Sequence, residues 1–330
     1  MRALRAHAFV RSPEDAVRAL RVDTVPVPKP RRGQVLVKMS FAPCNPAEIL
    51  YITGTYGIDR PLPATPGFEG AGTVVAHGGG MIARWMLGKR VATGGHDCSG
   101  TWAEYCLSDA TACLPLSGKL SLEQGATALA NPITAQALVS LAKGRRALVN
   151  TAAAGQLGRM VHQLATRRGL SVINVVRRAA QAEPLRKNGA EVLVSEEPGF
   201  EELLKRRCHE LQATLALDAI AGPTTGILLD ALPKEGEVVV YGSLSGQPSS
   251  GIGPMELAFG HKRVRGFEIA AHLKQAGLLS SIRMGNAAQS MIASGAVQSE
   301  IRRRLTLEEA PTVLVDYVKE MSAGKMLFAL

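Results

Sequence analysis

The sequence predicts an α/β protein in which a doubly wound parallel sheet is joined to a second, β-rich domain. Residues 1 to about 115 contain short apolar strands separated by glycine and proline. From residue 147 onward strands and helices alternate, which is typical of a parallel sheet covered by helices. The length agrees with two domains, because 330 residues exceed the roughly 250–300 at which one hydrophobic core stops growing.

The elements follow from capping signals and hydrophobic periodicity. Ser121-Leu-Glu-Gln124 forms a capping box that opens a long helical stretch rich in alanine and leucine, and Thr306-Leu-Glu-Glu309 opens another helix. Strands are expected at residues 34–38, 72–76, 147–150, 171–176, 191–195, 214–218, 237–241, 264–269 and 326–330. Further helices are expected at residues 159–168, 181–188, 200–211, 225–232 and 278–293.

Composition and charge exclude several classes of protein. With 46% hydrophobic and 20% charged residues the chain is neither disordered nor fibrous. The net charge of +10 comes from arginines in short groups, such as Arg145-Arg146 and Arg177-Arg178, with no aromatic residues interleaved. We interpret these groups as solvated faces and sites for small anionic ligands, and we expect no nucleic-acid partner.

The sequence also indicates a cytoplasmic protein. Its five cysteines form no C-x-x-C pair, so we expect free thiols in a reducing compartment. Residues 1–12 lack the apolar core of a signal peptide. The most apolar stretch, residues 126–142, is interrupted by Asn131, Pro132 and Gln136, which excludes it as a membrane span, so no membrane partner is expected.

A glycine-rich turn indicates a dinucleotide site. The segment Ala153-Ala-Gly155-Gln-Leu-Gly158 lies between a predicted strand and a predicted helix, with the spacing of G-x-G-x-x-G and alanine in the first place. A pyrophosphate would approach the backbone at Gly155 and the helix N-terminus behind it, while Gly158 allows close packing of helix and strand. The predicted coenzyme contacts on this turn of a Rossmann nucleotide-binding domain are Ala153, Gly155, Gln156, Leu157 and Gly158. The alternative is a glycine turn in another α/β protein.

The end of the next strand favours NADPH over NADH. An NAD site usually places an acidic residue about 20 residues after the glycines, to bind the ribose hydroxyls. Here the strand ends in Arg177 and Arg178 and carries no acid at its tip. A guanidinium group suits the 2′-phosphate of NADPH, so both arginines are predicted coenzyme contacts, although ordinary surface charges would give the same pattern.

Several motifs together resemble the zinc-independent medium-chain dehydrogenase/reductase superfamily, in its quinone oxidoreductase and trans-2-enoyl thioester reductase branch. The opening Pro26-x-Pro28-x-Pro30 is followed by Gly33-Gln-Val-Leu-Val-Lys38. The other motifs are Asn45-Pro-Ala-Glu-Ile49, Gly54-Thr-Tyr56-Gly57, Pro66-Gly-Phe-Glu-Gly70, Asn131-Pro-Ile-Thr-Ala135, Asn188-Gly-Ala190, Asp218 and Gly324-Lys325. The segments 131–135 and 173–177 are similar to those of the enoyl thioester reductases, although the quinone reductases share much of the rest.

The resemblance implies a domain organisation and a chemistry. A GroES-like catalytic domain would comprise residues 1–117 and 271–330, and a Rossmann NADPH-binding domain residues 118–270. At the positions where related alcohol dehydrogenases carry a cysteine and a histidine on catalytic zinc, this chain has Asn45 and Phe68. Neither replaces the lost donors, and His96 and Cys98 are interpreted as a chance scatter, so no metal site is expected.

Without zinc, an acceptor already activated by conjugation is expected: a 2-enoyl thioester, an enone or a quinone. By resemblance Tyr56 would donate a hydrogen bond or proton to the reduced acceptor, and Asn45 would orient the acceptor or the coenzyme amide. A surface aromatic residue and a turn asparagine are the structural alternatives. The remaining predicted coenzyme contacts are Thr134, Gly242, Ser243 and Lys325. The alternative for Thr134 is a threonine in the interior of a helix, and the alternative for Lys325 is an ordinary surface cation.

Two other classes of protein remain as alternatives. One is an NADPH-binding protein with weak turnover, like the crystallin-like or RNA-binding members of the superfamily. The other is a zinc alcohol dehydrogenase with unusual ligands. The resemblance further implies a homodimer formed near residues 265–269, and it leaves open which small-molecule acceptor is reduced.

Overall fold

The computed structural model describes residues 1–57, 61–95 and 99–330 of the chain, which divides into two compact units. Unit 1 contains residues 1–133 and 278–330, and unit 2 contains residues 134–277. Both divisions fall later in the sequence than the boundaries expected at 117/118 and 270/271. The first falls later because Ala126 packs with Ala71 and Leu327 in a core cluster of unit 1.

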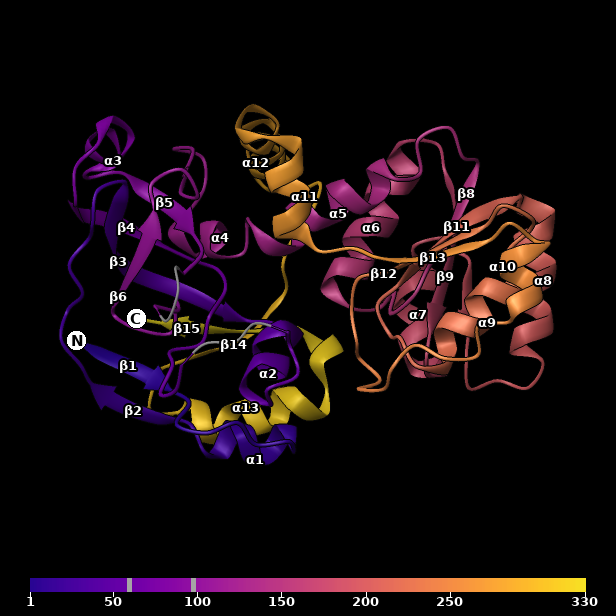
Figure 1. Cartoon of the computed structure of the whole chain (residues 1–330), viewed down its shortest axis with the longest axis horizontal. Helices are drawn as coiled ribbons and strands as arrows, with labels where there is room; N and C mark the ends of the chain where they lie inside the picture. Colours follow the sequence, from indigo (N-terminus) through magenta and orange to yellow (C-terminus); the bar gives the residue numbers. More distant parts are fainter. Residues whose placement is uncertain (58–60, 96–98) are drawn as a thin grey trace. The chain divides into compact units, whose positions relative to one another are not determined.

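Unit 2 is built on a six-stranded parallel sheet, as the sequence predicts (Figure 1). Its strand order, β10-β9-β8-β11-β12-β13, is that of the doubly wound dinucleotide-binding fold. The strands are β8 (Ala147–Asn150), β9 (Ser171–Val176), β10 (Val192–Val194), β11 (Ala213–Asp218), β12 (Glu237–Val240) and β13 (Arg263–Gly266).

Helices cover both faces of this sheet. Leu204 of α8 and Leu228 of α9 share one core cluster with Val149 and Ile173 of the central strands. Leu185 of α7 packs with another cluster, which contains Val176, Val192 and Val194. The helices are α6 (Gln156–Arg167), α7 (Ala179–Lys187), α8 (Phe200–Leu211), α9 (Pro223–Ala231), α10 (Pro254–Ala258) and α11 (Ile269–Ala276), and α5 (Ala130–Ser140) crosses the division between the units.

Unit 1 is β-rich and joins the two ends of the chain. Its seven-stranded sheet has the order β14-β15-β3-β4-β5-β7, with β6 paired to β3, and β1 and β2 form a separate antiparallel pair. The C-terminal strand β15 pairs antiparallel with β3, so Met326 lies opposite Cys44. The strands are β1 (Arg2–Arg5), β2 (Arg21–Thr24), β3 (Gln34–Cys44), β4 (Gly70–His77), β5 (Arg90–Thr93), β6 (Tyr105–Asp109), β7 (Leu114–Pro115), β14 (Ile301–Leu305) and β15 (Lys325–Ala329).

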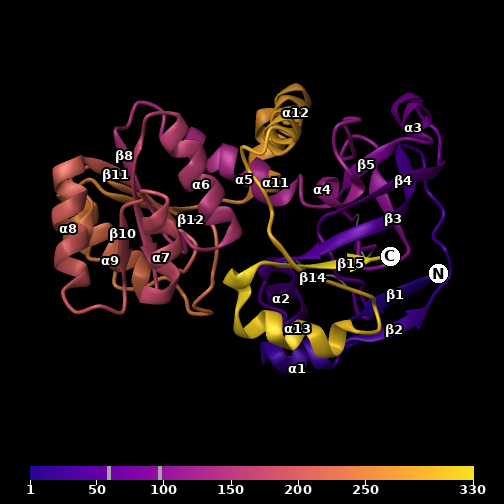
Figure 2. The same ribbon diagram turned by 180° about the vertical axis from the view of Figure 1, so that it is seen from behind.

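The helices of unit 1 also come from distant parts of the sequence. The C-terminal α13 lies beside the N-terminal α1 in both views of the molecule (Figures 1 and 2). Their apolar residues, such as Val17 and Leu314, share a core cluster with Tyr51 of α2. The helices are α1 (Pro13–Arg18), α2 (Pro46–Ile52), α3 (Met81–Met86), α4 (Leu122–Ala126), α12 (Leu278–Ala293), α13 (Ala310–Lys319) and the 3-10 turn η1 (Met321–Ala323). Within the residues described, none of these helices or those of unit 2 is long and apolar enough to cross a bilayer.

Several expected elements differ in their bounds from those observed. The helix expected to open at Thr306 begins at Ala310, and the strand expected at residues 34–38 continues to Cys44. The helical stretch opened by Ser121 is divided into α4 and α5, because the chain leaves the helix at Thr127. The strand expected at residues 264–269 ends at Gly266, and Glu268 then caps α11 by accepting hydrogen bonds from the backbone N–H groups of Ala270 and Ala271.

Candidate active site

The glycine-rich turn joins the carboxyl end of β8 to the start of α6. Ala152 adopts φ +48°, and Gly155 is the residue before the first helical turn. Thr151 fastens the turn to the neighbouring strand, since its hydroxyl donates to the Leu217 carbonyl at 3.0 Å and accepts from the Ala219 N–H at 2.8 Å. The first N–H groups of α6 have no acceptors within the helix, so this terminus favours an anion.

Gly158 allows the helix to lie directly against this turn. A Cβ at position 158 would lie 2.5 Å from the Ala152 carbonyl oxygen and 2.7 Å from the Ala153 Cα. A Cβ at position 155 would have the same carbonyl oxygen as its nearest neighbour, at 3.2 Å. The two glycines therefore have different roles: Gly158 is required for packing, and Gly155 keeps the backbone open at the helix end. The turn fits a bound pyrophosphate.

A buried pair of asparagines supports this turn, although neither residue is among those predicted from the sequence. Asn150 of β8 and Asn174 of β9 lie side by side in the parallel register. The Asn150 amide donates to the Gly158 carbonyl at 2.9 Å and to Asn174 Oδ1 at 3.1 Å, linking the helix to two strands. The sequence signal for this pair was a polar asparagine near the end of each of two largely apolar strands.

The predicted 2′-phosphate contacts lie at the same edge of the sheet. Arg177 and Arg178 follow β9 directly and are both exposed. Arg177 forms an exposed ion pair with Glu196 at 3.6 Å, which holds the side chain only weakly. Because β8 and β9 are parallel neighbours, the arginines and the glycine turn share the carboxyl edge at which such sheets bind ligands.

Gly242 and Ser243 follow β12 at this carboxyl edge as well. Gly242 has to be glycine, since a Cβ there would lie 2.6 Å from the Ala219 carbonyl oxygen. The turn after β11 is organised by Asp218, a buried carboxylate that accepts from the backbone of Ile220 and Ala221 at 2.8 and 3.0 Å. Thr134, in contrast, lies half-buried on α5.

A second group of predicted residues lies inside unit 1. Lys325, only 3% exposed, donates to Asn45 Oδ1 and, at 3.2 Å, to Glu69 Oε1. Asn45 Nδ2 donates to the same Glu69 oxygen at 3.1 Å, and the other Glu69 oxygen accepts from the Ala130 N–H at 2.8 Å. The structure thus brings Asn45 and Lys325 together around a buried carboxylate. Lys325 has internal partners here, and a coenzyme contact at this residue stays a prediction.

Glu48 connects two segments of this region and is another residue that was not predicted. Asn45 is the N-cap of α2, and Glu48, three residues later, accepts from the Asn45 N–H at 2.8 Å, as in a capping box. Its other oxygen accepts from the Phe68 N–H at 2.9 Å. An asparagine followed three residues later by glutamate was the sequence signal for this cap.

Burial changes the acidity of Glu48. Complete burial, followed by the nearby charge of Glu69, raises the pKa of Glu48 to about 7, although the Phe68 and Asn45 N–H groups act in the opposite direction. Lys325 lowers this pKa slightly.

The raised pKa of Glu48 predicts a pH-dependent stability. Since ionisation is unfavourable in the folded state, its contribution to the free energy of unfolding is full below about pH 4.5 and is lost as the pH rises to about 7. The loss amounts to about 3 kcal/mol on the scale of 1.4 kcal/mol per pKa unit. In urea unfolding measured at several pH values, Glu48→Gln relative to the parent should gain stability as the pH rises. A difference that does not vary with pH would contradict this.

Tyr56, the predicted proton donor, packs against Phe68, whose backbone N–H donates to Glu48. Tyr56 is 37% exposed, and its ring stacks on that of Phe68 with centroids 4.8 Å apart and planes at 29°. Phe68 also contacts the buried Tyr51 edge-on at 5.7 Å. The donor loop is thus supported by packed aromatic rings, and the Tyr56 ring reaches solvent.

The donor set at the former zinc positions does not fit zinc. Asn45 presents an amide that is bonded to Lys325 and Glu69, and Phe68 has no donor atom. Over residues 1–57, 61–95 and 99–330, no three His, Cys, Asp or Glu side chains are grouped as a metal would require. His96 and Cys98 lie outside the described residues. We therefore derive no chemistry from a metal at Asn45 and Phe68.

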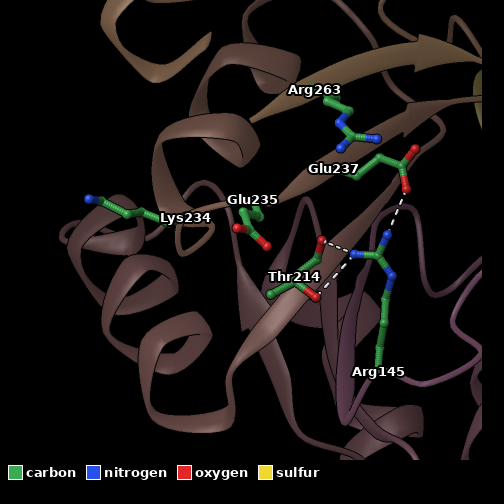
Figure 3. A pocket seen from close by; sticks show the side chains of 6 residues that line it. All are labelled: Arg145, Thr214, Lys234, Glu235, Glu237 and Arg263. Carbon is green, nitrogen blue, oxygen red and sulfur yellow. Dashed lines mark hydrogen bonds and ion pairs between the residues drawn. The ribbon is translucent and has the colours of Figure 1, made fainter. Parts of the chain in front are cut away.

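A pocket of about 300 Å³ lies at the opposite edge of the unit 2 sheet, where the strands begin (Figure 3). Arg145 crosses it to donate to Thr214 and, at 2.7 Å, to Glu237, which also accepts from Arg265 at 2.7 Å. Arg145 and Glu237 are already paired with each other, and the pocket lies away from the carboxyl edge. We interpret it as an ion-pair network that joins the starts of β11 and β12.

The strand order and the glycine turn define a class, the proteins with a doubly wound dinucleotide-binding domain. Two family models match the chain: one described as an alcohol dehydrogenase GroES-like domain, over residues 31–118, and one described as a zinc-binding dehydrogenase, over residues 157–280. The predicted fold class, a Rossmann sheet plus a GroES-like domain, is confirmed.

Relatives and solved structures narrow the class. The mitochondrial enoyl-[acyl-carrier-protein] reductase of Caenorhabditis elegans is 33% identical over 72% of this chain and 69% of its own length. A putative NADPH:quinone reductase from Mesorhizobium loti is 31% identical, with a TM-score of 0.93 over 100% of this chain and 98% of its own. The quinone oxidoreductase of Escherichia coli, solved with NADPH, shares the fold at 22% identity and a TM-score of 0.86, covering all of both chains.

The chain belongs to the medium-chain dehydrogenase/reductase superfamily, in the zinc-independent branch of enoyl thioester reductases and quinone oxidoreductases. The family prediction is confirmed, and with it the prediction of an oxidoreductase. The comparisons give no support to the alternative of a weakly catalytic binding protein.

Proposed function

We propose that the protein uses NADPH to reduce a conjugated carbon–carbon double bond, with a 2-enoyl thioester as the preferred acceptor. The observation that carries the proposal is an exposed phenol, Tyr56, supported on Phe68 at a site whose donor set does not fit zinc. A conjugated acceptor needs a proton donor and hydrogen bonds but no Lewis acid. The enoyl reductases among the relatives favour the thioester over an enone or a quinone.

The residues of unit 2 would hold the coenzyme. The α6 N-terminus and the turn at Gly155 would bind the pyrophosphate, and Arg177 and Arg178 would bind the 2′-phosphate. Gly242 and Ser243 would contact another part of the coenzyme at the same edge of the sheet. Bound NADPH supplies a hydride. Thr134 would contact the coenzyme near the nicotinamide.

Residues of unit 1 would act on the acceptor. Addition of hydride at the β-carbon leaves an enolate on the thioester, whose oxygen needs a hydrogen-bond donor and whose α-carbon needs a proton. The Tyr56 hydroxyl can supply either. Asn45, fixed by Lys325 and Glu69, is proposed to orient the acceptor from the adjacent helix start.

An NADPH-oxidation assay tests this function. Crotonyl-type thioesters, enones and quinones are compared under the same conditions, and the thioesters should give the highest kcat/KM. A preference for quinones would instead assign the protein a quinone oxidoreductase activity. Absence of oxidation with all three acceptors, together with salt-sensitive RNA binding, would favour the binding-protein alternative.

Replacing Arg177 should reduce the preference for NADPH. Loss of a charge-assisted hydrogen bond to a phosphate costs about 1.5–3 kcal/mol, so Arg177→Ala should weaken NADPH binding about 10- to 100-fold and leave NADH binding unchanged. Calorimetric titration with each coenzyme measures this. Arg167→Ala, at the far end of α6, is the matched control. Equal weakening for NADH and NADPH would refute the 2′-phosphate contact.

We further propose a cytoplasmic homodimer formed through the edge of the unit 2 sheet. β13 ends the strand order and pairs with β12 on one side, and Met255 on α10 and Phe259 at its C-terminus are exposed. The free, buried thiols of Cys44, Cys106, Cys113 and Cys208 suit a reducing compartment. Light scattering should give twice the chain mass, and Phe259→Asp should give a monomer. A parent protein that is monomeric at micromolar concentration would refute the dimer.

A further inference from the structure

We propose that Glu48 is a positioning residue for Tyr56 and acts through Phe68. The proposal rests on the proposed function of Tyr56, but it concerns a different residue, one buried in the core of unit 1 and out of reach of any acceptor.

The contacts form a short chain from the carboxylate to the phenol. Glu48 holds the backbone of Phe68 through one oxygen at 2.9 Å and the start of its own helix, at Asn45, through the other at 2.8 Å. The Phe68 ring in turn carries the Tyr56 ring at 4.8 Å. Phe68 thus contacts Glu48 through its backbone and Tyr56 through its ring, so its backbone position sets where the Tyr56 ring lies.

Both carboxylate oxygens are needed for this role. The ionised group accepts two N–H bonds that converge from segments more than 20 residues apart in the sequence, at Asn45 and Phe68. A glutamine in its place has one accepting oxygen and presents an NH₂ group to the other N–H, which is then left without an acceptor. Phe68 or Asn45 must shift, and a tyrosine displaced by a fraction of an ångström loses its alignment with the acceptor.

Glu48 and its neighbour Glu69 have different partners, so the positioning role belongs to Glu48. The groups that face Glu48 are Cys44 at the end of β3, Glu69 at the start of β4, Tyr317 on α13 and Lys325 on β15. Glu69 is occupied by Asn45, Lys325 and the Ala130 N–H. The carboxylate that accepts from the Phe68 N–H is that of Glu48.

A double-mutant cycle tests the proposal. Glu48→Gln is introduced into the parent and into Tyr56→Phe, and kcat is measured with the best thioester. We expect a loss of about tenfold in the parent and none beside Tyr56→Phe, because the phenol through which Glu48 acts is absent there. Equal losses in both backgrounds would assign Glu48 a general structural role and overturn the proposal. Glu104→Gln, at a half-buried carboxylate of unit 1 that pairs with Arg2, is the control.

The pH profile gives a second readout. Glutamine imitates the protonated form of Glu48. Parent and Glu48→Gln should therefore have similar kcat values at pH 5.5 to 6, which is on the order of one unit below the pKa of Glu48, and their kcat values should diverge above pH 8. A ratio of parent to variant that is constant with pH would contradict the positioning role.

A second variant keeps the test decisive if Glu48→Gln does not fold. Phe68→Leu keeps the backbone N–H bond to Glu48 but removes the ring under Tyr56, and it should reproduce the loss of kcat with KM for NADPH unchanged. Full activity of Phe68→Leu would overturn the proposal. If Tyr56→Phe itself keeps full activity, the proposed role of Tyr56 fails instead, and the two failures are thereby distinguished.

Discussion

Tyr56→Phe is expected to lower kcat for the best enoyl thioester by about 100-fold or more, the usual contribution of a positioned general acid. The substitution removes one hydroxyl and keeps the ring that stacks on Phe68, so the loop keeps its support. Coenzyme binding to the glycine turn of unit 2 should not change. Steady-state kinetics with the acceptor varied, together with an NADPH titration, would show this separation.

Tyr105→Phe, on β6 of the same unit, is the matched control and should retain parental activity. A Tyr56→Phe enzyme with unchanged kcat would remove Tyr56 from the mechanism. Loss of NADPH binding in that variant would instead indicate a folding defect.

Gly158→Ala should have the largest effect on the coenzyme site. The added Cβ would meet backbone at 2.5 and 2.7 Å, which no side-chain rotation relieves, so α6 must move away from its strand. Overpacking of this kind costs about 1–3 kcal/mol of folding free energy. Because α6 presents its N-terminus to the pyrophosphate, NADPH binding should weaken by at least about tenfold as well. Thermal unfolding and calorimetric titration measure the two effects.

Gly155→Ala separates packing from binding. The nearest contact of its Cβ is 3.2 Å, so the stability should fall less than in Gly158→Ala, while the methyl group occupies the space needed for close approach of the pyrophosphate. Equal loss of stability in the two variants would contradict the roles assigned to these glycines.

The nucleotide-binding unit could be predicted largely from its sequence, because its signals are local. The glycine turn and the arginines after β9 lie within about 30 consecutive residues, and each strand or helix of the alternation is indicated by its own residues. Helix α8, at Phe200–Leu211, has the bounds expected from periodicity alone, and so does α12 of unit 1, at Leu278–Ala293.

The buried cluster of unit 1 could not be predicted in the same way. Lys325 meets Asn45 across 280 residues of sequence, and nothing near either residue indicates the other. The pairing depends on β15 returning beside β3, a contact that tertiary structure alone creates. The sequence therefore predicts Asn45 and Lys325 as separate candidates. Glu48 and Glu69, which hold the region together, lie in motifs of the resemblance, but nothing in those motifs indicates that the two carboxylates meet.

The break in the helical stretch after Ser121 has a similar origin. Alanine and leucine favour a continuous helix, but α4 ends at Ala126 in order to pack against the unit 1 sheet, and α5 begins at Ala130 beside the Glu69 carboxylate. Tertiary contacts override helix propensity in such short segments.

The most direct test of metal-free hydride transfer from NADPH follows a labelled hydride with chelator-treated protein. NADPH deuterated at C4 of the nicotinamide is incubated with a crotonyl thioester, and the product is analysed by mass spectrometry. We expect a saturated thioester that carries one deuterium at the β-carbon, formed at the same rate with and without the chelator. A product without deuterium, or a reaction that stops when metal is removed, would contradict the proposed mechanism.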